Sequence, residues 1–329
     1  MPTLFDADPV QAIVTADWHL CDRPPAARKS EPDWFDAMRR PLNEIRWLQT
    51  HLKRPAVLVA GDIFDTWRVS PALLSFALRH IPENTYVIPG QHDLPYHRYE
   101  DVYLSALWTL VEAKRVCLIP NTGPVHINDR LSVFGFPWKA FELREQQKAR
   151  KKLTTTSKQV TPISLALVHA YCFVNGAGYP NAPQEARAGN LLKEFTGFDW
   201  LVVGDNHVPF ESSRGATQLF NCGSLMRRRS DQQQHRPRVG LLHRSGAMSS
   251  YELDCSLDAL DVSSKEEPSM EDLLHSVDLE LVLRTIRSLS GGDLDWREAV
   301  RLHLQTNDVP DGARRAIQLA MEGVREGHS

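Results

Sequence analysis

Residues 201–210 read LVVGDNHVPF, an apolar run that stops at a glycine and continues with Asp205, Asn206 and His207. The apolar run is typical of a buried β-strand. Its polar end fits a metal-binding turn, a damaged copy of such a turn, or an ordinary polar loop after a strand. These three interpretations require different residues at the other strand ends, so the rest of the chain decides between them.

Four other short runs also stop at polar turns. They are AIVTAD at 12–17, AVLVAGD at 56–62, TYVIPGQHD at 85–93 and ISLALVHA at 163–170. Between the first three runs, apolar residues recur at helical spacing, as at Trp34, Met38 and Ile45 and again after Pro71. Alternating strands and helices predict βαβ units and a largely parallel sheet.

Further short runs follow without long helices between them. They are LSVFGFPW at 131–138, TQLFNCG at 217–223, RVGLLHR at 238–244 and SSYELD at 249–254. Strands joined by short connections commonly pair antiparallel. These runs therefore predict a second, mainly antiparallel sheet packed on the first, within an α/β fold.

Charge separates the C-terminal part from the rest of the chain. Residues 256–329 carry 15 Asp and Glu against 8 Lys and Arg, whereas the remainder carries 26 against 30. Leu279, Leu283 and Ile286 recur there at helical spacing. We expect one domain over 1–261, whose mildly basic surface either meets a polyanion or is ordinary solvated charge, and an acidic C-terminal helical appendage over 262–329. The appendage either binds a partner or covers the core of the domain.

Other features of the sequence concern location and thiol chemistry. No run of about 18 apolar residues is present, and MPTLFDADPV at the N-terminus lacks the basic and apolar regions of a signal peptide. We therefore expect a cytoplasmic protein that does not enter a membrane. The five cysteines are scattered without a CxxC pair, which predicts reduced thiols. The basic stretch KARKKLTTTSK at 148–158 predicts a mobile loop.

Potential metal ligands stand at the ends of five predicted strands. They are Asp17 and His19, then Asp62, then Gln91, His92 and Asp93, then His169, and then Asp205 and His207. Side chains at the carboxyl ends of parallel strands meet at one edge of a sheet. A single histidine after a strand is usually a turn or core residue, but five strand ends in register predict a metal site.

In chain order these motifs are DWH, GD, GQHD, H and GDNH. The series resembles the calcineurin-like metallophosphoesterases, whose pattern is DxH, GD, GNHD, H and GHxH, over residues 12–245. The resemblance implies a calcineurin-like two-sheet β-sandwich flanked by helices. It also implies two divalent metal ions at the strand ends and hydrolysis of a phosphoester.

The resemblance assigns a role to each motif residue. The first metal would be held by Asp17, His19 and His207, the second by Gln91, His169 and Asp205, with Asp62 bridging both. A shared carboxylate has a physical basis, because two cations about 3.5–4 Å apart repel each other. His92 would contact the phosphate and protonate the leaving oxygen, with Asp62 as the other catalytic residue, while Asp65 and Asp93 would orient ligands.

Two positions depart from the family pattern. Gln91 replaces the usual Asn, and Asp205 replaces the first His of GHxH. Both substitutes keep an oxygen that can bind a metal ion, so the pattern favours a functional variant over a dead site. The added charge of Asp205 favours hard cations, with manganese preferred and magnesium as the alternative.

The segment after the last motif indicates which branch of the family the chain resembles most. NCGSLMR at 221–227 is similar to the closing segment of SbcD-type nucleases. That similarity implies an exo- or endonuclease acting on DNA in recombination or repair, a homodimer, and a coiled-coil ATPase partner of the SbcC type. Two alternatives stay open, namely a small-molecule phosphodiesterase or phosphatase, and an inactive scaffold whose second metal site is empty.

Arginines cluster beside this segment. They are Arg227, Arg228, Arg229, Arg236 and Arg238. They either neutralise a DNA backbone or form a solvated hairpin. The aromatic residues near the motifs, Trp18, Trp67, Tyr96 and Trp138, are expected to pack under loops rather than to stack on bases.

Overall fold

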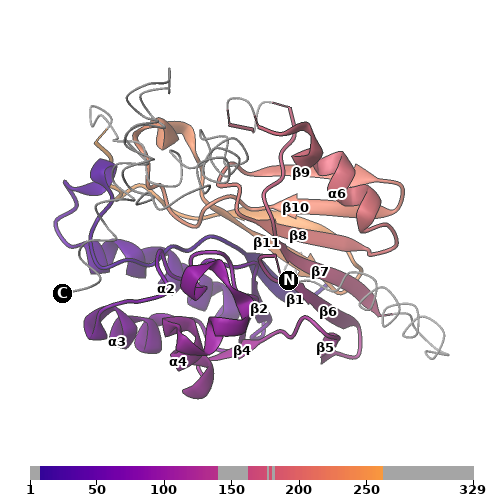
Figure 1. The fold of residues 1–329 in the computed structure, drawn as a ribbon, viewed down its shortest axis with the longest axis horizontal. Coiled ribbons are helices and arrows are strands. Elements are labelled where there is room, and N and C mark those ends of the chain that lie inside the picture. The colour runs from indigo at the N-terminus through magenta and orange to yellow at the C-terminus, as the bar shows by residue number, and fades with distance from the viewer. Residues whose placement is uncertain (1–7, 140–161, 176–177, 180–181, 262–329) are drawn as a thin grey trace, which may run out of the picture. The chain divides into compact units, whose positions relative to one another are not determined.

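The computed structural model describes residues 8–139, 162–175, 178–179 and 182–261. These residues form two six-stranded sheets that pack face to face, with helices on the outer side of each (Figure 1). This arrangement confirms the predicted α/β two-sheet sandwich. The predicted basic loop at 148–158 and the predicted helical region at 262–329 lie outside the described residues.

The first sheet has the order β12-β11-β1-β2-β3-β4. Its strands are β1 (Val10–Thr15), β2 (Ala56–Val59), β3 (Thr85–Val87), β4 (Val116–Leu118), β11 (Arg238–His243) and β12 (Met248–Glu252). The four strands from β1 to β4 run parallel. β11 pairs antiparallel with β1, and β12 pairs antiparallel with β11. The predicted βαβ order is thus confirmed for this sheet.

The second sheet has the order β5-β6-β7-β8-β10-β9. Its strands are β5 (Pro124–Asn128), β6 (Leu131–Phe136), β7 (Ile163–His169), β8 (Trp200–Gly204), β9 (Phe210–Arg214) and β10 (Thr217–Asn221). The four central strands β6, β7, β8 and β10 are parallel, and only the edge strands β5 and β9 are antiparallel to their neighbours.

The prediction of a mainly antiparallel second sheet was therefore wrong. A hairpin joins β9 to β10, and β10 inserts between β8 and β9. The chain reverses twice between β8 and β10, so these two strands run parallel despite their short connection. The strands β11 and β12, which were expected in the second sheet, instead extend the first sheet beside β1.

Alternation along β1 shows how the layers are held together. Ala12 and Val14 face the second sheet and join a core with Leu165 and Val202, whereas Ile13 faces the helices. A strand that is covered on both faces reads as a continuous apolar run. This is why the sequence of β1 shows no alternation of polar and apolar residues.

Helices cover the outer faces of the two sheets (Figure 1). The first sheet is covered by α2 (Trp34–His51), α3 (Pro71–His80) and α4 (Ala106–Glu112), and the second by α6 (Ala188–Glu194). Short 3-10 turns are η1 (Ala26–Arg28), η2 (Pro95–His97), η3 (Tyr99–Leu104), η4 (Gln184–Ala186) and η5 (Ser230–Gln234). No helix in the described ranges is both long and apolar enough to cross a membrane.

Side-chain caps fix where two of these helices begin. Asp33 accepts a hydrogen bond from the backbone N–H of Asp36 at the start of α2, and Ser70 accepts one from Leu73 at the start of α3. Pro71 occupies the first turn of α3, where a missing N–H costs nothing. Each cap satisfies an amide that the helix itself leaves without a partner.

A buried ion network joins the first helices to the end of the described chain. Arg28 is fully buried and pairs with Glu31 and with Asp258, the latter at 2.8 Å. Arg40 of α2 lies 2.6 Å from the other Glu31 oxygen, and Arg227 lies 3.0 Å from Asp258. Because buried charges need partners, this network fixes the segment around Asp258 against α2.

Replacing Glu31 with alanine should destabilise the fold strongly. The change removes the carboxylate that both Arg28 and Arg40 contact and leaves a buried guanidinium with one carboxylate fewer. We expect the free energy of unfolding, measured by urea denaturation, to fall by about 3–5 kcal/mol. Glu83→Ala is the control, because its ion pair with Arg54 is largely exposed and should contribute less than about 1 kcal/mol. Equal losses in the two variants would contradict the prediction.

Candidate metal centre

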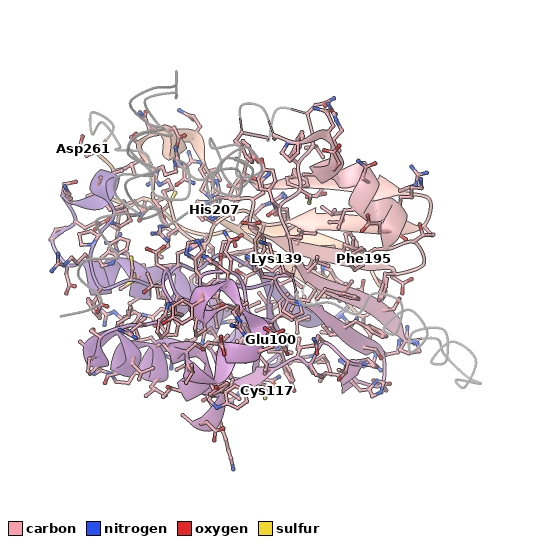
Figure 2. The ribbon with its side chains drawn as sticks, viewed as in Figure 1. Glu100, Cys117, Lys139, Phe195, His207 and Asp261 are labelled. Atoms are coloured by element: carbon pink, nitrogen blue, oxygen red, sulfur yellow. The ribbon has the colours of Figure 1, made fainter. Side chains whose placement is uncertain are left out.

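Loops from both sheets meet where β1, β2, β7 and β8 end. The backbone N–H groups of Asp17 and His19 donate to the carbonyl oxygens of Gly61 (3.1 Å) and Asp62 (3.0 Å). The N–H of Asp205 donates to both carboxylate oxygens of Asp17, at 3.0 and 3.1 Å. These bonds link the loops of the two sheets, and His207 lies in the central region of Figure 2.

One ligand cluster contains Asp17, His19 and His207. Their potential ligand atoms lie within 4.8 Å of one another, and the two Nε2 atoms of His19 and His207 are 2.9 Å apart. Two imidazole nitrogens that each bind a metal at about 2.0–2.1 Å come this close to each other. Burial lowers the pKa of both histidines, so both hold the neutral form that a metal ion requires.

A second cluster contains Asp17, Asp62 and His169. The His169 Nε2 lies 3.2 Å from Asp62 Oδ2, and within the described residues neither buried atom has a hydrogen-bond partner apart from this contact. Buried polar atoms are nearly always hydrogen-bonded, so this pair marks a position that suits a cation. The His169 Nδ1 lies 2.7 Å from the carbonyl of Ala60, which orients the ring with Nε2 towards the cluster.

Gln91 and Asp205, the two departures from the family pattern, lie side by side. The Gln91 Nε2 donates to Asp205 Oδ1 at 3.2 Å, and Gln91 is buried. Among the described His, Cys, Asp and Glu residues, no ligand cluster includes Asp205. Gln91 and Asp205, two of the three residues predicted to hold the second metal, are thus joined by an amide-to-carboxylate hydrogen bond.

The electrostatics of the cluster depend on Asp62. Burial opposes ionisation of this carboxyl, yet His169 and His92 hold its pKa well below the usual range. Burial raises the pKa of Asp17, and the neighbouring Asp62 raises it further. Burial opposes protonation of His169, but Asp62 outweighs it and raises the pKa of His169. A metal ion bound here would therefore displace a proton from His169.

Two further carboxylates, those of Asp65 and Asp93, lie around the ligand clusters. Asp65 Oδ1 lies 3.2 Å from His19 Nδ1 and accepts a hydrogen bond from Arg228 at 2.8 Å. Burial acts to raise the pKa of Asp65, but the neighbouring Arg228 guanidinium outweighs this effect and keeps the pKa below its usual value. A carboxylate on Nδ1 fixes the ring so that Nε2 faces the ligand cluster.

Asp93 ties the loop after β2 to the loop after β3. Its carboxylate accepts backbone N–H groups from Ile63 (3.3 Å), Phe64 (3.1 Å) and Gly90 (3.1 Å). Burial, reinforced by Asp62, raises the pKa of Asp93 to about 7. The side chain therefore contributes to the backbone geometry around Asp62 instead of facing a ligand.

His92 lies beside the predicted metal ligands in a fixed orientation. Its backbone N–H donates to Asp62 Oδ1 at 2.9 Å, and its Nδ1 lies 2.8 Å from the carbonyl of Asp65. A carbonyl can only accept, so Nδ1 carries a proton. The ring packs edge to face on His19 with centroids 4.9 Å apart.

Most of the arginines proposed for DNA binding have intramolecular partners. Arg227 pairs with Asp258, Arg228 with Asp65 and Arg238 with Glu211, at 3.0, 2.8 and 3.0 Å. Arg236 lies 3.6 Å from Cys255 Sγ, and the 44% exposed Arg229 lies 3.5 Å from Asp231. Arg228 thus positions the site through Asp65, a role that its place in a basic run did not reveal.

The aromatic residues near the motifs differ in their environments. Trp18 is fully buried, which confirms the expected packing role. Trp67 and Tyr96 contact each other with ring centroids 5.9 Å apart, and Tyr96 is exposed. Trp138 lies against His169 at 6.2 Å.

Glycines that the sequence reasoning passed over are essential to the geometry. A Cβ at Gly61, Gly90 or Gly204 would lie 2.2 Å from His169 Nδ1, 2.1 Å from Asp62 Oδ1 or 2.2 Å from Ala60 O. All three distances are far below van der Waals contact, so only glycine fits. The available signal was that each of these glycines immediately precedes a predicted ligand.

Four predicted ligands have backbones in the left-handed region. The φ angles are 52° at Asp17, 44° at His19, 55° at Asp62 and 87° at Asp205. This conformation is uncommon for residues other than glycine and marks places where the surrounding structure determines the backbone.

The segment that follows β10 forms backbone hydrogen bonds to two residues of the site. The backbone N–H of Ser224 donates to His207 O and that of Leu225 to Asp17 O, both at 3.2 Å. One short segment, 221–227, therefore forms backbone hydrogen bonds to two members of the first cluster. The same segment resembles SbcD-type nucleases in sequence.

The model of the calcineurin-like phosphoesterase family matches residues 11–209. The chain belongs to this family. Metal-dependent hydrolysis of phosphoesters is what this membership indicates, and the ligand clusters of the phosphoesterase suit it. No curated protein sequence is similar enough to the chain to count as a relative.

Several solved structures are similar to the chain at low sequence identity. A Staphylococcus aureus protein provisionally assigned as a 5'-nucleotidase is 12% identical with a TM-score of 0.47, and the match covers 74% of this chain but 53% of that one. The calcineurin-like phosphoesterase YfkN from Bacillus subtilis is 13% identical with a TM-score of 0.41, covering 82% and 98%. A novel archaeal phosphodiesterase is 12% identical with a TM-score of 0.39, covering 74% and 99%.

Gly61→Ala should lower metal binding although it replaces none of the predicted ligands. The new methyl group would lie 2.2 Å from His169 Nδ1, and the residue has a φ of +92°. We expect fewer than two manganese ions per chain by elemental analysis, and a fold destabilised by about 1–2 kcal/mol. Gly123→Ala is the control, because its Cβ would meet nothing within 4 Å. Full metal content in Gly61→Ala would contradict the steric argument.

Asp205→Ala tests whether the altered turn holds a metal ion. We expect bound manganese to fall from two ions per chain to one, with a parallel loss of phosphoester hydrolysis. Asp205→His should restore part of both, with a shifted metal preference, because imidazole and carboxylate select different cations. Two bound ions and normal turnover in Asp205→Ala would show that GDNH is only a turn.

Proposed function

We propose that the phosphoesterase is a dinuclear-metal phosphodiesterase that acts on DNA. The observation that carries the two-metal proposal is the position of Asp62 Oδ2, which lies 3.2 Å from His169 Nε2 and 3.8 Å from His19 Nε2. One buried carboxylate within reach of both ligand clusters is what a pair of mutually repelling cations requires.

The donors at the site suit hard or borderline divalent cations. Asp17, His19 and His207 would hold the first ion and His169, Gln91 and Asp205 the second, with Asp62 shared between them. Carboxylate and amide oxygens among the donors favour manganese, with magnesium as the alternative. When bound, the two ions polarise the phosphoryl oxygens and supply an activated water for attack on phosphorus.

His92 supplies the proton for the leaving oxygen. The carbonyl of Asp65 accepts the proton on its Nδ1, so His92 acts as the acid in its doubly protonated form, in which Nε2 passes its proton to the departing alkoxide and leaves the neutral ring. Asp62, which accepts the backbone N–H of His92, places the acid beside the ligands. The chain thereby holds the acid and the metal donors in one rigid arrangement.

DNA as the substrate is supported by the likeness of residues 221–227 to SbcD-type nucleases and by the basic balance of residues 1–255. The same likeness supports the homodimer, the SbcC-type ATPase partner and the cytoplasmic location as proposals. A small-molecule phosphodiester is the second candidate. It is favoured by the ion pairs of Arg227, Arg228 and Arg238, which neutralise charge that a DNA backbone would use.

His92→Ala should separate metal binding from catalysis. We expect both metals to stay bound while cleavage of DNA slows by about 100-fold or more. Hydrolysis of bis-p-nitrophenyl phosphate should slow much less, because p-nitrophenolate departs without a proton. His97→Ala, an exposed histidine on the same loop, is the matched control. An equal loss on both substrates would be incompatible with His92 as the acid.

Substrate class and the inactive-scaffold alternative are tested together. The purified protein is assayed on hairpin, single-stranded and duplex DNA and on bis-p-nitrophenyl phosphate, with manganese, magnesium or chelator. Metal-dependent cleavage of DNA supports the nuclease. Turnover of the small diester alone supports the second candidate, and no turnover with fewer than two bound metals per chain identifies a scaffold.

A further inference from the structure

A loop after β7 leads from the metal centre to a hollow on the protein surface. His169 ends β7, and Phe173 follows four residues later, within about 14 Å along the chain. The Cys172 carbonyl accepts a hydrogen bond from Asn206 Nδ2 at 2.8 Å, and Asn206 stands between Asp205 and His207. The loop is therefore fixed to the motif that carries two predicted ligands.

Charge also connects this loop to the centre. Burial raises the pKa of the Tyr179 hydroxyl, and the carboxylate of Asp205 raises it further. The Tyr179 ring lies against that of Tyr171 at a tilt, with ring centroids 4.8 Å apart, and its backbone N–H donates to the Tyr171 hydroxyl at 3.0 Å. The tyrosines thus lie within electrostatic range of the ligand Asp205.

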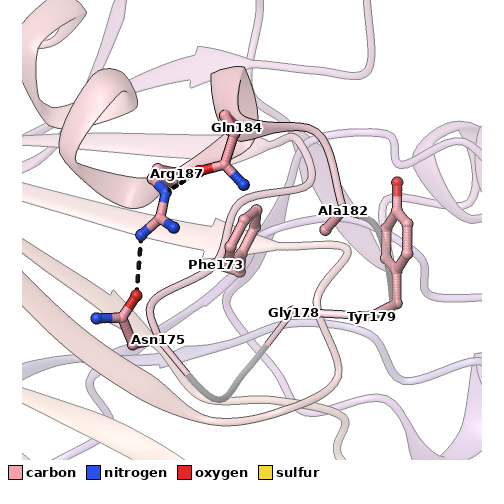
Figure 3. A pocket seen from close by; sticks show the side chains of 7 residues that line it. All are labelled: Phe173, Asn175, Gly178, Tyr179, Ala182, Gln184 and Arg187. Atoms are coloured by element: carbon pink, nitrogen blue, oxygen red, sulfur yellow. Dashed lines mark hydrogen bonds between the residues drawn. The ribbon is translucent and has the colours of Figure 1, made fainter.

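The hollow has a volume of about 420 Å³, within the roughly 300–1,000 Å³ typical of small-molecule sites. Figure 3 shows Phe173 at its centre between Arg187 and Tyr179. The other lining side chains include Asn175, Ala182 and Gln184. An aromatic floor with amide and guanidinium groups around it combines apolar area with directional donors.

Arg187 is held in place by neutral groups. Its Nε donates to Gln184 Oε1 at 2.6 Å and its Nη1 to Asn175 Oδ1 at 2.9 Å (Figure 3). The guanidinium also lies 5.7 Å from the Phe173 ring centroid. Within the described part of the chain, no carboxylate forms an ion pair with this side chain, in contrast to Arg227, which pairs with Asp258.

The acid nearest to Arg187 in the sequence is Glu185, an exposed residue that forms no ion pair with Arg187 in the described part of the chain. Residues 170–184 read AYCFVNGAGYPNAPQ, without Asp or Glu. Arg187 is exposed, and its two hydrogen bonds fix the orientation of the guanidinium. A positive charge is therefore accessible to a ligand on the loop that leads to the candidate metal centre. A guanidinium with fixed geometry and open donors is suited to bind phosphate oxygens.

We propose that Arg187 and this hollow bind a second phosphate of the substrate, adjoining the one that is hydrolysed. The inference rests on the proposed phosphodiesterase function and adds a requirement for a polyanionic substrate. Tyr179 and Phe173 face the sugar and base that accompany the second phosphate. A nucleic acid strand and a nucleotide with several linked phosphates share this chemistry.

The test compares Arg187→Gln with the parent on substrates that differ in phosphate number. With bis-p-nitrophenyl phosphate, which has one phosphate, we expect rates within about twofold of the parent. With a single-stranded oligonucleotide or a dinucleoside polyphosphate, we expect KM to rise about tenfold or more, as for loss of a charged hydrogen bond. The substrate that shows the larger rise identifies which of the two sources the hollow serves.

Two controls separate this role from a general effect of charge. Arg214→Gln makes the same change at an exposed position at the end of β9, and Arg187→Lys keeps the charge without the planar fork. We expect the first to bind substrates normally and the second to recover part of the affinity. Equal losses in Arg187→Gln and Arg214→Gln, or none in either, would overturn the proposal.

A binding measurement distinguishes failure of this inference from failure of the proposed function. Fluorescence anisotropy with a labelled oligonucleotide in the presence of chelator reports affinity without turnover. If the parent hydrolyses no phosphodiester, the proposed function fails, while weaker binding by Arg187→Gln still supports the hollow as a phosphate site. If the parent is active and Arg187→Gln binds the oligonucleotide as tightly as the parent, the second-phosphate site is wrong.

Discussion

The carboxylate of Asp62, 1% exposed and within reach of two histidines, is the interaction on which the rest of the site depends. A buried carboxylate is stable only when cations or hydrogen-bond donors surround it. The parallel strands bring those groups to it, because β1 and β2 end at the same edge and β7 and β8 end opposite them. Asp65 and Asp93 then fix the loops, so that the donors cannot turn away to water.

The sequence was sufficient to predict the ends of the strands but not all of their neighbours. Polar residues after apolar runs identified Asp17, Asp62, His169 and His207 as a group on the expectation that their strands end at one edge of one sheet, whereas β1 and β2 lie in one sheet and β7 and β8 in the other. The order of strands in the second sheet was missed, since a hairpin can insert its second strand between its first strand and the sheet. The insertion of β10 beside β8 depends on packing between segments that are distant in the sequence, and local sequence patterns do not predict it.

The arginines show a second limit of reading residues in sequence order. A run of basic side chains beside a metal motif suggests contact with phosphate, yet Arg227 and Arg228 are paired with Asp258 and Asp65. The partner of Arg228 lies 163 positions away. Whether an arginine is available to a ligand depends on which carboxylate the fold brings next to it. Arg187, which stands alone in the sequence, acquires only amide partners.

The left-handed backbones at Asp17, His19, Asp62 and Asp205 imply a conflict between stability and activity. Each such residue costs about 1 kcal/mol or more relative to a relaxed backbone, and the crowded carboxylates add repulsion to that cost. Glycine or asparagine at these positions would relieve strain or charge and raise the melting temperature while removing predicted metal ligands. A screen that selects only for thermal stability would therefore enrich inactive variants at this edge of the sheets.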